Sequence, residues 1–409
     1  MDFHDAEIQT LVRRYRTFLD AHVMPLEADF LAGGFAAVAP ALDAARTRAK
    51  ADGLFAPQLP PELGGLGAAL PLVGAISQVL GRTPLGHYVF HMQAPDVSNM
   101  ELLLRAATPA QRERFLLPLT RGEIRSCFAM TEPDKAGSNP LQIAARAVRD
   151  GDDWVLTGRK WFTSSADGAA FAITMAVSDP DAARPHERAT FFIVPTDTPG
   201  FRLERNLPVM GHAGSGWASH GEVVFEGVRI PDTLRVGPVG AGFAMAQERL
   251  GPGRIHHAMR WLGITERALE LMVAHAATRE LAPGVRLGHK DTVQAWIADS
   301  WVELEAARGL VERTALRIER EGQRAARLDI SAIKLLVANV LDRVLDRAIQ
   351  AHGALGMTDL TPLAFWYRHE RAARIYDGPD EVHRALIGRD LLERAGMPRH
   401  PTPPGRSGG

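Results

Sequence analysis

The sequence is short of cysteine, of long apolar runs and of excess charge. A single cysteine, Cys127, excludes an intrachain disulfide framework and fits a reducing compartment. With 47 basic and 48 acidic side chains, the net charge of −1 gives no electrostatic case for a nucleic-acid or membrane-surface protein. Apolar stretches such as residues 171–177 are too short to span a bilayer, and residues 1–7 lack a signal-peptide pattern. We therefore predict a cytoplasmic protein with no membrane insertion and no nucleic-acid partner.

The periodicity of the apolar residues changes twice along the chain. Residues 1–125 read as helices, with Ile8, Tyr15 and Leu19 at helical spacing. Residues 126–235 contain short β-branched or aromatic segments bounded by Gly, Asp and Pro, with hairpin chemistry at 150–153. The helical period returns over 236–396, and the Pro- and Gly-rich tail at 397–409 is predicted to be disordered. Helices, then a small sheet, then helices indicate an α+β fold.

One acidic residue stands out near the C-terminus, within residues 374–383 (Arg-Ile-Tyr-Asp-Gly-Pro-Asp-Glu-Val-His). The Gly-Pro step after Asp377 opens a turn, so this carboxylate is expected at a helix end. Taken alone, an aspartate at such a place is more often an N-cap or a turn former. Other motifs in the chain favour a chemical role.

Four further motifs accompany Asp377, at residues 127–139, 160–165, 279 and 350–356. In this order they resemble the acyl-CoA dehydrogenase family over residues 5–395. Together with residues 250–257 (Leu-Gly-Pro-Gly-Arg-Ile-His-His), the Asp-Gly-Pro-Asp-Glu-Val-His form looks most like one branch of that family. In vertebrates, this branch is fused to an aminoglycoside-phosphotransferase-like kinase, and we expect no kinase segment in these 409 residues. The resemblance implies an N-terminal helical bundle, a central small β-domain and a C-terminal four-helix bundle.

The resemblance also implies a reaction. An acyl-CoA thioester would be oxidised to a trans-2-enoyl-CoA, with FAD as the hydride acceptor and an electron-transfer flavoprotein as the electron acceptor. Asp377 stands at the position of the base that abstracts the α-proton, where most of the family has Glu and the kinase-fused branch also has Asp. To act near neutral pH, the Asp377 carboxyl needs a pKa that burial has raised.

Several segments are implied to hold FAD. Regular strand alternation would place Trp161 and Thr163 on one face and Phe162 on the other, with the Thr163 hydroxyl directed at flavin N5. Arg279 is implied to bind the pyrophosphate, and residues 350–354 to reach the flavin of a neighbouring subunit in a homodimer or homotetramer. The implied cofactor-binding residues are Phe128, Met130, Thr131, Gly137, Ser138, Trp161, Phe162, Thr163, Arg279, Gln350, His352, Gly353, Ala354, Pro379 and Glu381.

The implied acyl-CoA contacts are Ser138, Gly251, Arg254 and Gly378. Arg254 follows a Gly-Pro-Gly step, and the resemblance makes this a loop near the start of a helix that lines the acyl channel. From the residues alone, Arg254 would more often be a solvated charge and residues 161–163 a half-buried strand. The 15 histidines lack metal-ligand spacing, the glycines of 237–242 lack a βαβ context, and Cys127 is expected to pack. We therefore predict no metal site.

Other functions share these motifs. An acyl-CoA oxidase, a nitroalkane oxidase or a reduced-flavin monooxygenase would keep the fold and change the substrate or electron acceptor, and nitroalkane oxidases also use an aspartate base. A flavin-bound DNA-associated stress protein would need a basic C-terminal surface, but acids are interleaved through residues 368–394. A flavin-binding scaffold without turnover is disfavoured by the retained Asp377 and Arg254. Acyl chain length and branching stay open.

Overall fold

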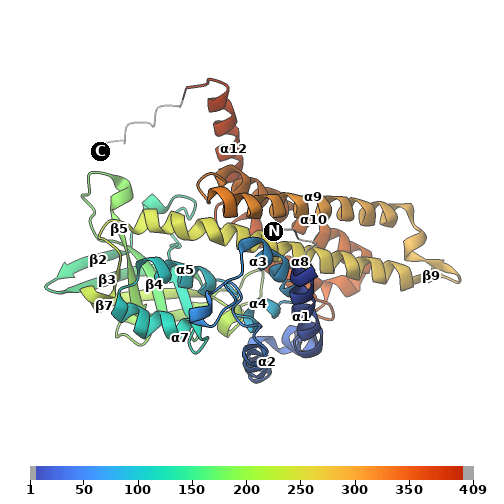
Figure 1. Ribbon diagram of the computed structural model, residues 1–409, viewed down its shortest axis with the longest axis horizontal. Coiled ribbons are helices and arrows are strands. Elements are labelled where there is room, and N and C mark those ends of the chain that lie inside the picture. The colour runs from blue at the N-terminus through green and yellow to red at the C-terminus, as the bar shows by residue number, and fades with distance from the viewer. Residues whose placement is uncertain (1–5, 399–409) are drawn as a thin grey trace.

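The computed structural model describes residues 6–398. Figure 1 shows a sheet at one end of the molecule, and helices from the N-terminal and C-terminal parts of the chain packed together at the other. In α1, the predicted helical stripe is confirmed by the full burial of Tyr15 and Leu19. The Pro- and Gly-rich residues 60–67 contain the 3₁₀ turn η2 (Pro61–Leu63). The N-terminal elements are α1 (Ala6–His22), η1 (Met24–Leu26), α2 (Glu27–Ala51), α3 (Leu70–Leu80), α4 (Gly86–Val89), α5 (Asp96–Ala106), α6 (Pro109–Gln111), η3 (Arg112–Leu116) and α7 (Leu117–Thr120).

The central sheet follows the predicted strands. Its order is β6-β7-β3-β2-β4-β5-β8, and β1 pairs in parallel with β4. The predicted hairpin is confirmed, because Asp150 pairs with Asp153 across a turn in which Gly151 has φ 63°. The strands are β1 (Ser126–Ala129), β2 (Arg146–Asp150), β3 (Asp153–Ser164), β4 (Phe171–Val177), β5 (Ala189–Pro195), β6 (Phe201–Asn206), β7 (His220–Pro231) and β8 (Arg235–Val236).

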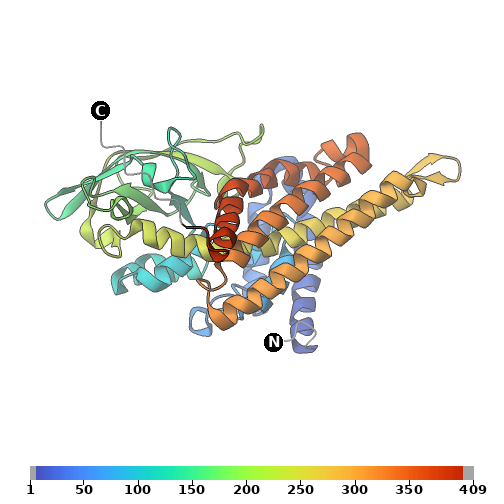
Figure 2. The same cartoon turned by 90° about the horizontal axis from the view of Figure 1, so that it is seen from above.

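The C-terminal helices α8 (Gly242–Thr278), α9 (Asp291–Glu321) and α10 (Arg327–His352) pack along one another, and α11 (Pro362–Glu370) and α12 (Asp380–Arg394) pack on α10. At 1.5 Å per residue, the 37 residues of α8 span roughly 55 Å. This helix runs from the sheet to the far tip, where the hairpin of β9 (Glu280–Ala282) and β10 (Val285–Arg286) projects (Figure 2). The predicted α+β fold is confirmed. From residue 399 onward, the tail predicted to be disordered lies outside the described residues.

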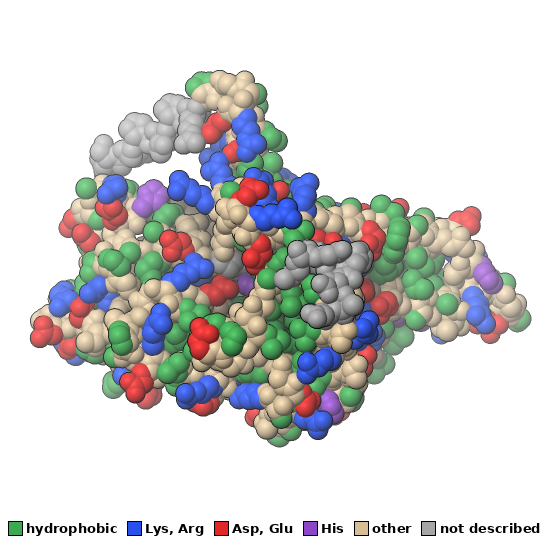
Figure 3. All heavy atoms as spheres, in the orientation of Figure 1, with side chains coloured by type: hydrophobic (Ala, Val, Ile, Leu, Met, Phe, Trp, Pro, Cys, Tyr) green, Lys and Arg blue, Asp and Glu red, His purple; other side chains and the backbone are tan. Residues whose placement is uncertain are grey.

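Two observations bear on the prediction that the protein does not insert into a membrane. Figure 3 shows Lys and Arg side chains intermixed with Asp and Glu over the visible face, as the near-zero net charge suggests. One stretch, Ile8–Ala51, is long and apolar enough to span a membrane by length and composition alone. Core helices of soluble proteins also meet this criterion, and here Gly34 (φ 70°) breaks the helical geometry inside α2. The absence of membrane insertion therefore stays a prediction.

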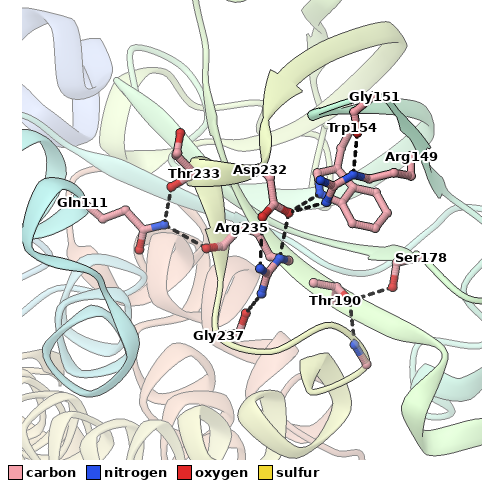
Figure 4. A network of polar contacts seen from close by, with 11 residues as sticks. Gln111, Arg149, Gly151, Trp154, Ser178, Thr190, Asp232, Thr233, Arg235 and Gly237 are labelled. Carbon is pink, nitrogen blue, oxygen red and sulfur yellow. Dashed lines mark hydrogen bonds and ion pairs between the residues drawn. The ribbon is translucent and has the colours of Figure 1, made fainter.

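A polar network fixes the segment that leads from the sheet into α8 (Figure 4). The Asp232 carboxylate accepts hydrogen bonds from Trp154 Nε1 (2.7 Å), Arg149 Nη1 (2.9 Å) and Arg235 Nε (2.9 Å). Gln111, from the N-terminal helices, donates to the carbonyl oxygens of Thr233 and Arg235, both at 2.8 Å. The network thus joins the β2–β3 hairpin and the N-terminal helices to residues 232–235, which precede α8. Hydrogen bonds from Arg235 and Trp154 hold the pKa of Asp232 well below its ordinary value.

Asp232→Asn is expected to lower the stability of the protein by about 1–2 kcal/mol at pH 7, because charge-assisted hydrogen bonds become neutral ones. A carboxyl group whose pKa is lower in the folded than in the unfolded protein stabilises the fold at pH values above the unfolded-state pKa. This contribution is lost as the pH falls through the folded-state value. The gap in melting temperature between wild type and variant should persist down to about pH 4 and narrow below it. Asp181→Asn, at an exposed position, is the control, and equal melting temperatures at pH 7 would contradict the prediction.

Candidate active site

Asp377 lies in the turn between the 3₁₀ segment η10 (Arg371–Arg374) and α12, where Pro379 is the N-cap. The predicted placement at a helix end is confirmed. Asp377 has φ 53° and Gly378 has φ 97°, so two consecutive residues are left-handed. A side chain at position 378 would also meet His383, whose Nε2 would lie 2.9 Å from an added Cβ. Glycine is therefore required directly after the candidate base.

Helix α8 lies against the Asp377 carboxylate. His257 Nε2 is 3.4 Å from Asp377 Oδ2, and the Asp377 side chain is only 17% exposed. One helical turn earlier, a Cβ added to Gly253 would lie 3.2 Å from the same oxygen. Gly253 and His257 thus form a notch on α8 that receives the carboxylate, and a larger residue at 253 would crowd it.

Burial sets the acidity of this carboxyl group. It raises the pKa of Asp377, while the nearby positive charges of Arg254, Arg249 and Lys334 oppose the shift. Burial also holds the pKa of His257 well below its ordinary value, so this imidazole is neutral at physiological pH. The predicted direction of the Asp377 shift is confirmed.

Arg254 was predicted to lie on a loop near the start of a helix, but the structure places it elsewhere. It lies well inside α8, and its Nε donates to the Asp377 carbonyl oxygen at 2.8 Å. The prediction was wrong because a Gly-Pro-Gly step normally interrupts a helix. Here the following residues Ile255, Ala258 and Met259 are almost fully buried, and this packing outweighs the backbone hydrogen bond that a proline cannot donate.

The loop after β1 is bonded to β3 at the implied flavin position. Trp161 N donates to Thr131 O (3.0 Å), and Thr131 Oγ1 donates to Trp161 O (2.9 Å). The pairing of β3 with β7 shifts register between Lys160 and Thr163, and Phe162 has φ 48°. The predicted regular alternation was therefore wrong, because a bulge interrupts the strand.

A buried ion pair that was not predicted from the sequence anchors the same loop. Lys160 Nζ donates to Met130 O and to Glu132 Oε1, both at 2.8 Å, and neither side chain is more than 6% exposed. The Glu132 carboxylate also accepts from the backbone amides of Ala144 (2.7 Å) and Ala145 (2.9 Å). Every oxygen of Glu132 is thus bonded, and the loop is held rigidly against β3.

Arg249 of α8 connects this loop to the Asp377 turn. Its guanidinium lies 3.6 Å from the centroid of the Phe128 ring, and its Nε donates to Asn99 Oδ1 at 3.0 Å. Burial lowers the pKa of Arg249 to about 10, and the charge of Asp377 partly opposes this shift. Strand β1, helix α5 and the Asp377 turn therefore converge at one place.

The remaining predicted residues form a separate group. Arg279 follows the last residue of α8 and directly precedes β9, at the far tip from the start of α12 (Figures 1 and 2). The rings of His275 and His352 stack with centroids 4.3 Å apart, so the end of α8 meets the end of α10. Arg279 and residues 350–354 thus share one end of the molecule, away from Asp377. Gly137 and Ser138 are exposed on their loop, and the Glu381 side chain is 79% exposed.

The residues near Thr163 fit a flavin. The Thr163 side chain is fully buried, and within the described residues its hydroxyl has no hydrogen-bond partner. Beside it, the rings of Trp161 and Phe162 meet edge to face at 5.1 Å, and Phe162 is 47% exposed. An unpaired donor next to an aromatic surface suits an isoalloxazine ring. Over residues 6–398, no group of three or more His, Cys, Asp or Glu side chains is arranged to hold a metal ion.

A buried carboxylate with a raised pKa and a loop that suits a flavin, on an α+β scaffold, are compatible with the class of flavin-dependent dehydrogenases. Family models for the N-terminal, middle and C-terminal domains of acyl-CoA dehydrogenases match residues 5–123, 127–228 and 240–392. The chain belongs to the acyl-CoA dehydrogenase family.

Three relatives illustrate the match. The Mycobacterium tuberculosis protein named "Probable acyl-CoA dehydrogenase FadE2" is 42% identical, over 93% of this chain and 95% of that protein. Acyl-CoA dehydrogenase family member 11 of chicken is 38% identical over 95% of this chain, which spans only 51% of that longer protein. A solved Mycobacterium abscessus structure superposes with a TM-score of 0.90 at 38% identity, covering 96% of this chain and 99% of that one. The predicted resemblance is confirmed.

Three residues that face Asp377 were missed in the sequence, namely Arg249, His257 and Lys334. A signal was present for Lys334, because it shares a helix face with Val337, Ala338 and Leu341 in an apolar stripe, where a lysine is out of place. His257 lies one turn after Gly253, but that spacing becomes informative only once residues 251–253 are known to be helical. No feature of the sequence marks Arg249.

Proposed function

We propose that the protein catalyses the FAD-dependent α,β-dehydrogenation of an acyl-CoA thioester to a trans-2-enoyl-CoA, with Asp377 as the base. The observation that carries the proposal is the buried Asp377 carboxyl, with its raised pKa, at the point where α8, α10 and the β1 loop meet. FAD, when bound, supplies the acceptor for the hydride that leaves the β-carbon.

The chain's own residues handle the proton. The α-carbon C–H bond breaks, and its proton forms an O–H bond with the Asp377 carboxylate. Arg254 holds the Asp377 backbone at 2.8 Å, and the Gly253–His257 notch fixes the direction of the carboxylate. Thr163 presents its unpaired hydroxyl to the flavin from β3, and the Lys160–Glu132 pair holds the loop beneath it. Ser138, Gly251, Arg254 and Gly378 are proposed to contact the acyl-CoA.

Assembly and partners belong to the same proposal. Lys334 of α10 contacts the Asp377 turn, and Gln350 lies 16 residues further along the same helix, roughly 24 Å away at 1.5 Å per residue. We assign Arg279 and residues 350–354 to the flavin of a neighbouring subunit in a closed homodimer or homotetramer. The electron acceptor is an electron-transfer flavoprotein, and the location is the cytoplasm.

The proposed substrates are medium-to-long or 2-methyl-branched acyl-CoAs. Asp377 is one methylene shorter than Glu and faces Gly253 on α8, which leaves room near the α-carbon of the substrate. A single methylene discriminates by about 1–3 kcal/mol in an apolar pocket, so the preference should be graded.

Purified yellow protein should be mixed anaerobically with acyl-CoAs of graded length, and the flavin absorbance followed. We expect bleaching that is faster with medium-to-long or 2-methyl-branched acyl-CoA than with butyryl-CoA, and slow recovery in air. Rapid recovery in air would identify an oxidase instead. Bleaching by nitroalkanes and by no thioester would overturn the proposed function, and a sharp optimum at four carbons would overturn the proposed substrate class.

A further inference from the structure

The turn that carries Asp377 is an unfavourable conformation for the backbone. Asp377 has φ 53°, a left-handed conformation that few non-glycine residues adopt and that its surroundings must fix. Two donors reach the Asp377 carbonyl oxygen, namely Arg254 Nε at 2.8 Å and His383 Nε2 at 3.3 Å. Both act on one peptide group, and neither restrains the chain on either side of it.

Two groups restrain both sides of Asp377, namely the Arg374–Asp380 ion pair at 2.9 Å and Lys334 of α10, whose side chain is fully buried. Its Nζ donates to Ala373 O at 2.6 Å and to Gly378 O at 3.1 Å. These two carbonyl groups flank Asp377 in the chain, so one ammonium group ties together the residues before and after it. The rings of Trp261 and Tyr376 lie on the same group, with centroids 5.7 Å and 5.8 Å away.

The burial of Lys334 is costly and is not offset by a direct ion pair. The side chain is fully buried, and burial lowers its pKa to about 8. Among the described residues, no carboxylate forms a salt bridge with it. The equally buried Lys160 is different, because it pairs with Glu132 at 2.8 Å. The hydrogen bonds that Lys334 makes go instead to two carbonyl oxygens of the segment that carries Asp377, and an apolar residue would leave both acceptors without this donor. The ammonium group therefore acts on the backbone beside the base.

We propose that Lys334 is a positioning residue, which fixes the Asp377 turn and thereby the direction from which the base reaches the α-carbon. The inference rests on the proposed function of Asp377 and extends it to a second helix. Displacement of a reacting group by about 1 Å can lower a rate by about a hundredfold. A short aspartate side chain has little freedom to compensate for a shifted backbone, so the turn must be held from both sides.

Lys334→Met tests the proposal, because it keeps the apolar stem and removes all donors. Arg327→Met is the matched control. Arg327 lies on the same helix and ties α10 to α12 through Asp390, but it does not contact the Asp377 turn. Lys334→Gln, which keeps two N–H donors without the charge, is compared in parallel, so that the result does not depend on the folding of one variant.

We expect Lys334→Met to slow flavin reduction by acyl-CoA about a hundredfold. FAD content and acyl-CoA affinity should stay within about threefold of wild type, and Lys334→Gln should be intermediate. Amide hydrogen exchange over residues 373–379 should accelerate in Lys334→Met and not in Arg327→Met. A reduction rate within threefold of wild type, or equal losses in Lys334→Met and Arg327→Met, would overturn the proposal. If no acyl-CoA reduces wild-type flavin, the proposed function fails, and the exchange measurement alone decides whether Lys334 holds the turn.

Discussion

Asp377→Asn should keep FAD and bind acyl-CoA, yet reduce the flavin at least ~10³-fold more slowly than wild type. The amide nearly preserves the shape of the side chain but cannot take the α-proton. Single-turnover flavin bleaching measures the step directly, and the wild-type rate should rise with pH through the raised pKa of the carboxyl. Near-normal reduction by the variant would exclude Asp377 as the base.

The same variant should be at least as stable as wild type. Burial raises the folded-state pKa of Asp377 above its ordinary value of 3.8. The ionised carboxyl therefore destabilises the folded protein. This destabilisation grows as the pH rises above the pKa of the unfolded state and becomes constant above the pKa of the folded state. Removing it should leave the melting temperature at pH 7 unchanged or higher. A fall of several degrees would mean that Asp377 stabilises the fold and that its burial has another purpose.

Arg279→Ala should lower the FAD content of the purified protein and its melting temperature together. Arg279 lies at the tip of α8, and its planar guanidinium suits a pyrophosphate of a neighbouring subunit's cofactor. A ligand that binds only the native state stabilises it by mass action, so a tenfold loss of affinity removes about 1.4 kcal/mol at saturating FAD. Arg320→Ala, which changes an exposed arginine of α9, is the control.

Added FAD should separate the two effects of Arg279→Ala. If the melting temperature returns toward wild type as FAD is raised, cofactor affinity was the quantity lost. Light scattering should show a closed oligomer for wild type. A monomer with full FAD occupancy, or a variant with unchanged occupancy, would contradict the assignment of Arg279 to a site between subunits.

The sequence by itself determined the fold class, several of the strands and the position of Asp377 at a helix end. These follow from local composition and punctuation: the apolar run of residues 171–177, the turn at Gly151, and the Gly-Pro step after Asp377. Such signals are contained in a few neighbouring residues, so no knowledge of distant contacts is needed to find them. The implied flavin and acyl-CoA residues came from motif order, and their individual functions stay predictions.

Only the tertiary structure decided how the base is held. Residues 251–253 read locally as a helix breaker, yet the packing of α8 keeps them helical and turns Gly253 and His257 toward Asp377. Similarly, the bulge at Phe162 depends on how β3 pairs with β7. Lys334 meets the Asp377 turn across 39 to 44 residues of chain. Burial, and with it the pKa of Asp377, arises when segments far apart in sequence exclude water together, and no local pattern encodes that.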